Sequence, residues 1–378
     1  MGLLGIGSNG YGQLSLGHGE DTYLATDCVL SEGEDEFYPS DIAYITGGGN
    51  HTAVVTNSGV LYLCGQNSDG QLGLPLEIAD VHIYKRFSSV HKWKSVACGW
   101  NHTLALTSEG VVYSFGNNAF LQLGNANDKA STHVGYLLPL PKVKQISCGL
   151  RHSMAVTEDG HVYSWGANRH GQTGQKWEKT SSVNKVEGLS KVKKVVCGQY
   201  HSVVLTETSQ VYVFGLNKHG LLGISPQEIN SSFLPVEMIF STSRDMESPI
   251  VDISSGWNHI TVLDQQGHLY TWGRNDHFQL GMSVVEDNEE WLRVPVALTY
   301  RPQRIPLRRP VIEFVCGSEH TIALCENDEC FTWGWNEHGN CGTGNVVNVS
   351  SPTLLLNVRD VKMVACGYGQ TFIVGELV

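Results

Sequence analysis

Six histidines recur at one position of a repeated sequence pattern, and imidazole is well suited to acid–base chemistry and metal binding near neutral pH. Each histidine follows a glycine by three residues and precedes a second glycine by fourteen residues. One histidine per repeat spreads the rings apart, whereas a zinc site needs several ligands within about 2 Å of one ion. We therefore interpret them as structural residues that satisfy nearby backbone groups, and we expect no metal site. They are His51, His102, His152, His201, His259 and His320.

An acidic residue and a histidine stand side by side near the C-terminal end, at Glu337 and His338, shortly after Trp335. A carboxylate beside an imidazole is a conceivable general-base pair. The sequence, however, contains neither the nucleophile motif Gly-x-Ser-x-Gly nor the phosphate-binding motif Gly-x-x-x-x-Gly-Lys. We therefore expect a non-enzymatic protein with no catalytic residue and no cofactor, in which Trp335, Glu337 and His338 contact a partner.

Two tryptophans, Trp100 and Trp257, occupy matching places in Gly-Trp-Asn-His segments that lie three repeats apart. We expect both to line a central face, where a tryptophan beside polar residues is a plausible binding hot spot. Arg274, after a Trp-Gly pair, and Glu319, before a repeat histidine, complete the predicted partner-binding residues.

The elements that must position these residues are β-strands. Each repeat histidine begins an apolar run, a polar turn follows, and a second apolar run ends at the glycine. An asparagine two residues later is suited to bond its own main chain in a turn. About four strands per fifty residues, with frequent glycine, is typical of a β-propeller blade. The six repeat cores are residues 47–73, 97–124, 147–174, 196–223, 254–281 and 315–342.

A seventh repeat is divided between the two ends of the chain. Residues 365–378 match the first half of a repeat, with Gln370 in place of the histidine, and residues 4–17 match the second half. Joining the halves would close a ring and leave no open sheet edge at the seam. We therefore predict an all-β fold, a single domain over residues 1–378 that forms a seven-bladed β-propeller closed by its terminal halves.

Charge and hydropathy limit the possible partners. The formal net charge is −12 and no basic tail flanks the repeats, which disfavours binding to DNA phosphates. No apolar stretch is long enough to span a membrane. Five cysteines precede a repeat glycine and suit small buried positions in a reducing compartment, so we expect a cytoplasmic location, with the nucleus as a second compartment. These cysteines are Cys98, Cys148, Cys197, Cys316 and Cys366.

Three longer segments join repeats, at residues 18–46, 224–253 and 282–314, and each could hold an inserted wedge or a longer outer strand. The last contains an acidic stretch, 286–291, and a strongly basic stretch, 301–310. We interpret the basic stretch as a solvated loop, with an electrostatic steering patch as the alternative.

The pattern Gly-x-x-His-Thr, followed by Trp-Gly-x-Asn-x-x-Gly-Gln-Leu-Gly, resembles the regulator-of-chromosome-condensation repeat over essentially the whole chain. Residues 45–56 and 333–342 further resemble one branch of that family, the secretion-regulating guanine-nucleotide exchange factors of animals. Residues 333–342 and 97–100 also resemble a second branch, the yeast alpha-tubulin suppressor. The resemblance implies a propeller that binds other proteins on its faces.

Our main expectation is a protein-binding adaptor or regulatory subunit, a monomer within a hetero-complex. The second branch implies as partner the small zinc protein of diphthamide synthesis, together with a role in Elongator tRNA modification. The alternative is an exchange factor for a small GTPase, possibly linked to secretion, as the first branch implies.

Overall fold

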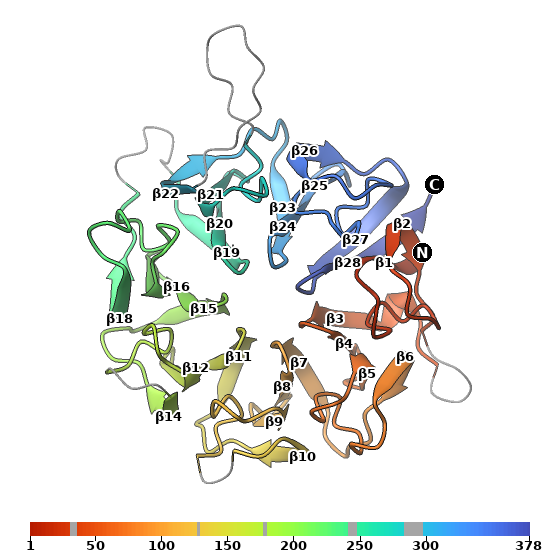
Figure 1. The fold of residues 1–378 in the computed structure, drawn as a ribbon, viewed down its shortest axis with the longest axis horizontal. Coiled ribbons are helices and arrows are strands. Elements are labelled where there is room, and N and C mark those ends of the chain that lie inside the picture. Colours follow the sequence, from red (N-terminus) through yellow and green to blue (C-terminus); the bar gives the residue numbers. More distant parts are fainter. Residues whose placement is uncertain (31–35, 127–128, 177–179, 241–247, 283–297) are drawn as a thin grey trace, which may run out of the picture.

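Seven antiparallel sheets of four strands each stand around a central axis, like blades of a propeller, in the computed structural model of the protein (Figure 1). The structure describes residues 1–30, 36–126, 129–176, 180–240, 248–282 and 298–378. No α-helix occurs in these residues, and none of their segments forms a helix able to cross a membrane. The predicted all-β, seven-bladed propeller is confirmed.

In every blade the first strand is the one nearest the axis. Blade 1 consists of β3 (Ile42–Gly47), β4 (His51–Thr56), β5 (Leu61–Gln66) and β6 (Asp80–Arg86); blade 2 of β7 (Trp93–Cys98), β8 (His102–Thr107), β9 (Val112–Gly116) and β10 (Thr132–Leu137). Blade 3 consists of β11 (Val143–Cys148), β12 (His152–Thr157), β13 (Val162–Ala167) and β14 (Thr180–Lys185); blade 4 of β15 (Val192–Cys197), β16 (His201–Thr206), β17 (Val211–Leu216) and β18 (Ser231–Glu237). Blade 5 consists of β19 (Ile250–Ser255), β20 (His259–Asp264), β21 (Leu269–Arg274) and β22 (Leu298–Arg304); blade 6 of β23 (Val311–Cys316), β24 (His320–Cys325), β25 (Cys330–Gly334) and β26 (Val349–Leu354). Blade 7 consists of β27 (Val358–Cys366), β28 (Gln370–Leu377), β1 (Gly2–Gly7) and β2 (Thr22–Asp27).

Blade 7 closes the ring with strands from both ends of the chain, as the divided repeat predicts. β1 pairs with β28 without interruption from Gly2 opposite Gly375 to Gly7 opposite Gln370. The N-terminal amino group also lies 3.2 Å from a carboxylate oxygen of Glu376. Because every edge of β1 and β28 is paired, neither strand offers an open edge at the closure.

The constant spacing of fourteen residues is the register of a hairpin. His102 in β8 lies directly opposite Gly116 in β9, and the same pairing recurs in blades 1 to 6. Gly116 has a φ of +109°, and a side chain there would also overlap the Asn101 carbonyl. A side chain at Gly99 would overlap the imidazole of His102. The two glycines therefore make room for the buried histidine and for the loop that precedes it.

The repeat histidines connect each blade to the next. Nε2 of His51 lies 2.9 Å from the Thr103 hydroxyl oxygen of blade 2. That hydroxyl donates its own proton to the Gln71 carbonyl of blade 1, at 2.7 Å. The imidazole must therefore donate from Nε2. The bonding partner differs from the nearby backbone groups that we expected, because the ring reaches across the boundary between two blades, which we call a seam. Equivalent bonds of 2.8–3.2 Å join His102 to Ser153, His152 to Ser202, His201 to Ser255, His259 to Thr321 and His320 to Thr371.

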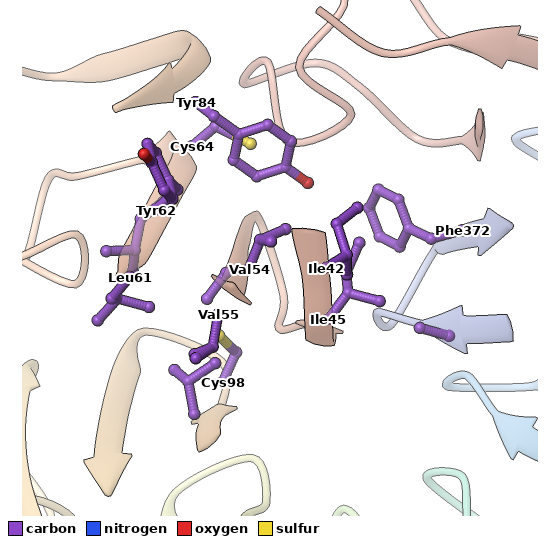
Figure 2. Close-up of a cluster of buried hydrophobic side chains, with 14 of the residues drawn as sticks. Ile42, Ile45, Val54, Val55, Leu61, Tyr62, Cys64, Tyr84, Cys98 and Phe372 are labelled. Atoms are coloured by element: carbon purple, nitrogen blue, oxygen red, sulfur yellow. The ribbon is translucent and has the colours of Figure 1, made fainter. Parts of the chain in front are cut away.

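Apolar side chains fill the spaces between blades. Figure 2 shows this packing around blade 1, where Phe372 from β28 lies beside Ile42 and Ile45 of β3. Cys98 of β7 closes the other side of the same cluster. A single core cluster thus includes residues from blades 7, 1 and 2, so apolar packing is continuous from the closing blade into blades 1 and 2.

Strand direction assigns every loop to one of two faces. The loops between first and second strands, and the turns between third and outer strands, lie on one side, which we call the motif face. The hairpins between second and third strands, and the links between blades, lie on the opposite side, the hairpin face. The asparagine of each motif-face turn is buried and bonds its own main chain; for example, Asn67 Oδ1 accepts from the Leu72 amide at 3.1 Å.

Replacing Thr103 by valine tests the bonds that cross the seams. The substitution keeps the side-chain shape but leaves the Nε2–H of His51 and the Gln71 carbonyl without this partner inside the core. We expect the free energy of unfolding to fall by about 2 kcal/mol in denaturant titrations. Thr208→Val, in an exposed hairpin, is the control and should change little; equal losses in both variants would contradict a special role for the seam.

Protonation of the seam histidines should limit stability in acid. Burial lowers the pKa of His102 to about 3, whereas an unfolded histidine titrates near pH 6.5. The unfolded chain therefore binds more protons, and stability falls as the pH drops from about 7 towards about 4. Blade 7 shows that glutamine fits this position, since Gln370 Nε2 donates to the Gly49 carbonyl at 3.1 Å.

His102→Gln should therefore weaken the pH dependence. Between about pH 7 and about pH 5, the variant should lose about 2 kcal/mol less unfolding free energy than the original chain. Urea titrations at the two pH values measure the difference. His18→Gln, at an exposed position, should leave the original dependence in place. An unchanged pH dependence in His102→Gln would contradict a buried neutral imidazole.

Candidate functional site

All seven residues predicted to contact a partner lie on the motif face. Trp100, Trp257 and Glu319 stand in loops between first and second strands, and Arg274 ends β21. Trp335, Glu337 and His338 belong to the turn between β25 and β26. The structure places them in two groups. Trp100 and Trp257 belong to an aromatic cluster on the axis, and the other five residues form a polar arc over blades 5, 6 and 7: Arg274, Glu319, Trp335, Glu337 and His338.

The aromatic cluster joins side chains from three blades. The ring centroids of Trp100 and Trp257 are 5.6 Å apart, although these residues come from blades 2 and 5. Tyr368 of blade 7 contacts both rings, with centroid distances of 5.9 Å to Trp100 and 5.5 Å to Trp257, so the three rings form a triangle. All three side chains are half-buried, and the indole Nε1 of Trp257 has no hydrogen-bond partner in the described part of the chain. The cluster therefore offers an aromatic surface at the centre of the face, while the Trp257 N–H is buried beneath it.

We did not predict Tyr368 as a member of this cluster. A sequence signal existed, because Tyr368 follows its repeat glycine directly, as Trp100 and Trp257 do. Burial raises the pKa of the Tyr368 phenol well above its ordinary value, so the phenol stays neutral.

A channel with a volume of about 370 Å³ runs beneath the cluster along the axis. The first strand of every blade lines it, and Tyr368 contributes at its motif-face end. Inside, Lys194 Nζ and Asp252 Oδ1 form an ion pair of 2.7 Å. Burial raises the pKa of the neighbouring Glu313 carboxyl, whose Oε2 accepts from the Val364 amide at 3.2 Å.

The polar arc is organised by the buried carboxylate of Glu319. Its Oε1 accepts from Asn258 Nδ2 at 2.8 Å, and its Oε2 accepts from Gln279 Nε2 at 2.6 Å. Arg274 Nη1 lies 3.4 Å from Oε1. Burial raises the pKa of Glu319, while the amide donors and the arginine favour the charged form. The carboxylate thereby joins the loops of blades 5 and 6.

Arg274 is held on two sides. Beyond Glu319, its Nη2 lies 2.6 Å and its Nε 2.9 Å from Oδ2 of Asp276, a half-exposed residue of the next turn. A guanidinium fixed by two carboxylates loses little side-chain entropy when a partner binds it. The sequence motif indicated Arg274 and Glu319 separately, and Asp276 was missed.

Trp335, Glu337 and His338 continue the arc towards blade 7. The Trp335 amide donates to the Glu319 carbonyl at 2.8 Å, which joins the two parts of the arc. The indole Nε1 donates to Glu337 Oε2 at 3.3 Å. His338 Nδ1 instead lies 2.7 Å from Asp21 Oδ2, across the seam to blade 7. Glu337 and His338 thus bond different groups and do not form the acid–base pair that their spacing allows.

The basic stretch at residues 301–310 lies away from this site. Arg301 and Arg304 belong to β22, on the outer rim, and Arg308 and Arg309 follow in a link on the hairpin face. The acidic stretch at residues 286–291 lies outside the described residues. Each of the three longer segments supplies an outer strand, namely β2, β18 or β22.

Curated relatives match almost the whole chain. The "Secretion-regulating guanine nucleotide exchange factor" of Mus musculus is 34% identical, over 99% of this chain and 84% of its own length. The protein of the same name from Bos taurus is 35% identical, over 99% of this chain and 83% of its own length. "Ultraviolet-B receptor UVR8" of Arabidopsis thaliana is 31% identical, over 97% of this chain and 68% of its own length.

These relatives correct our expectation of a non-enzymatic protein. Proteins named guanine nucleotide exchange factor catalyse nucleotide exchange, so the expectation is wrong. We had inferred the absence of catalysis from the absence of a nucleophile motif. Nucleotide exchange breaks no covalent bond and therefore needs no nucleophile. The small zinc protein of diphthamide synthesis and the tRNA-modification role have no support from these relatives.

A solved structure and a family model agree on the fold. Prp20p of Saccharomyces cerevisiae superposes with a TM-score of 0.86 at 22% identity, covering 100% of this chain and 92% of that protein; its study concerns binding to Gsp1p and histones. The family model described as "RCC1-like domain" matches residues 2–373. The chain therefore belongs to the RCC1-like family, the regulator-of-chromosome-condensation propellers that its repeats resemble.

Proposed function

We propose that the protein is a guanine nucleotide exchange factor for a small GTPase, and that the motif face contacts the GTPase. The observation that carries this function is the similarity, over 99% of the chain, to two relatives named as exchange factors. The face is chosen because it holds the aromatic cluster and the polar arc, whose tryptophans and arginine are the residue types that dominate protein interfaces.

Nucleotide exchange can be catalysed by binding alone. A factor that binds the nucleotide-free GTPase more tightly than the loaded form lowers the affinity of the GTPase for nucleotide by the same ratio. Such selectivity requires a surface that does not adapt to both forms. The polar arc supports this requirement, because Glu319 accepts bonds across the seam between blades 5 and 6, and Arg274 is held by Glu319 across that seam and by Asp276 within blade 5.

The exposed end of the arc supplies groups that are free to bind. Glu337 is exposed and forms no ion pair with any described residue; its only bond is with the Trp335 indole. A carboxylate beside an indole favours a cationic side chain, through charge and through the aromatic face. We therefore expect Trp335, Glu337 and His338 to contribute strongly to GTPase binding.

Release of fluorescent GDP from a panel of small GTPases tests the function. At least one GTPase should release nucleotide faster with the protein. The triple variant Trp335→Ala, Glu337→Ala, His338→Ala should lower that exchange rate by about tenfold or more. The control, Val90→Ala, Glu158→Ala, His161→Ala, changes one apolar, one acidic and one histidine side chain on the hairpin face and should retain the full rate.

Two results would contradict different parts of this assignment. If no GTPase of a panel that spans the small GTPase subfamilies responds, exchange activity is excluded. If a GTPase responds and both triple variants act as the original chain does, the activity stands but the arc does not contact the GTPase.

A further inference from the structure

Blades 3 and 4 carry exposed cations on the motif face that the sequence analysis did not single out. Arg151 stands in the first loop of blade 3, Arg169 in the outer turn of that blade, and Lys218 in the outer turn of blade 4. All three side chains are exposed, and none forms an ion pair with a residue that the structure describes. Arg151 and Arg169 are separated by a whole hairpin and Lys218 belongs to the next repeat, so no basic run marks them in the sequence.

Aromatic rings lie among these cations. The Arg151 guanidinium lies 4.3 Å from the ring centroid of Phe120, a residue of the blade 2 turn. Tyr200 of blade 4 packs against His170, with ring centroids 5.2 Å apart, and His170 directly follows Arg169. These contacts cross the seams between blades 2 and 3 and between blades 3 and 4. We call Phe120, Arg151, Arg169, Tyr200 and Lys218 the Arg151 patch.

Main-chain hydrogen bonds fix the patch residues within blade 3 and within blade 4. The Ala167 amide donates to the Arg151 carbonyl at 2.8 Å, which fixes the first loop of blade 3 against its outer turn. The Leu216 amide donates in the same way to the Tyr200 carbonyl in blade 4, also at 2.8 Å. Stacking on Phe120 further orients Arg151, so its guanidinium is presented with reduced freedom.

The remainder of the motif face has the opposite charge. In blades 5, 6, 7 and 1, Arg274 is the one Lys or Arg that the described residues place there, and both its partners are carboxylates. In blades 2, 3 and 4, Glu228 is the one described acidic residue, and Lys129 and Lys176 add to the patch cations. The acidic side chains of the other blades are Glu20, Asp21, Asp69, Glu77, Asp80, Asp276, Glu319 and Glu337.

We propose that the Arg151 patch binds an acidic segment of a protein partner, with carboxylates on the cations and apolar side chains on Phe120 and Tyr200. In a chain of net charge −12, a local group of cations that pairs with no acidic residue among those the structure describes attracts anions only over its own extent. A nucleic acid duplex carries a charge about every 1.7 Å along its axis and would extend over the acidic blades on either side. A short acidic segment can end where the patch ends. The site goes beyond nucleotide exchange and does not depend on it.

Fluorescence anisotropy with a defined probe tests this site on the full chain. The probe is a short fluorescein-labelled peptide of alternating glutamate and leucine, and a labelled single-stranded oligonucleotide of equal charge is the comparison. The peptide should bind, and Arg151→Glu with Arg169→Glu should weaken binding by about tenfold or more. Arg308→Glu with Arg309→Glu makes the same change in net charge on the hairpin face and should leave peptide affinity within about twofold of the original.

Three other results of this experiment would contradict the proposal that the Arg151 patch binds an acidic segment. Equal weakening by both double variants would show a response to net charge alone. Tighter binding of the oligonucleotide, lost in Arg151→Glu with Arg169→Glu, would identify a nucleic-acid site instead. Absence of peptide binding at low salt by the original chain would exclude the site. None of these outcomes bears on GDP release, so failure of this site and failure of exchange activity are distinguishable.

Discussion

A buried histidine that bonds the next blade is the interaction on which the ring depends. Each imidazole is the donor to a serine or threonine hydroxyl across a seam, and several of those hydroxyls return the bond to a turn of the first blade. The glycine before each histidine leaves room for the ring, and the glycine opposite it lets the chain turn. Neighbouring blades are therefore joined by buried polar bonds inside an apolar core, which fix their relative orientation.

The same seams position the groups that a partner would meet. Glu319 directly precedes His320 and is only 6% exposed. Around it, the amides of Asn258 and Gln279 and the guanidinium of Arg274 converge from blade 5. The rigid packing of the propeller is thus extended to the motif face by single side chains that are held from two blades.

The fold was predictable because its information is local and repeated. The fourteen-residue spacing reflects one hairpin, and the terminal half-repeats, around Gln370 and Ile6, revealed the closure. The site was predictable only where a residue broke the repeat pattern, as Trp100 and Trp257 do. Contacts between residues distant in sequence were not accessible: His338 meets Asp21 across 317 positions, and the Arg151 patch gathers one or two cations per blade.

Ring closure by the first and last strands has a consequence for the order of events on the ribosome. β1 cannot pair with β28 until residues 370–377 have been made, so the earliest strand waits through the synthesis of six blades. The intervening blades can collapse locally as they emerge, but the final seam is a contact of very high sequence separation and should form last and slowly. During that interval the nascent chain carries an unpaired β edge, the period in which a chaperone would be most useful to it.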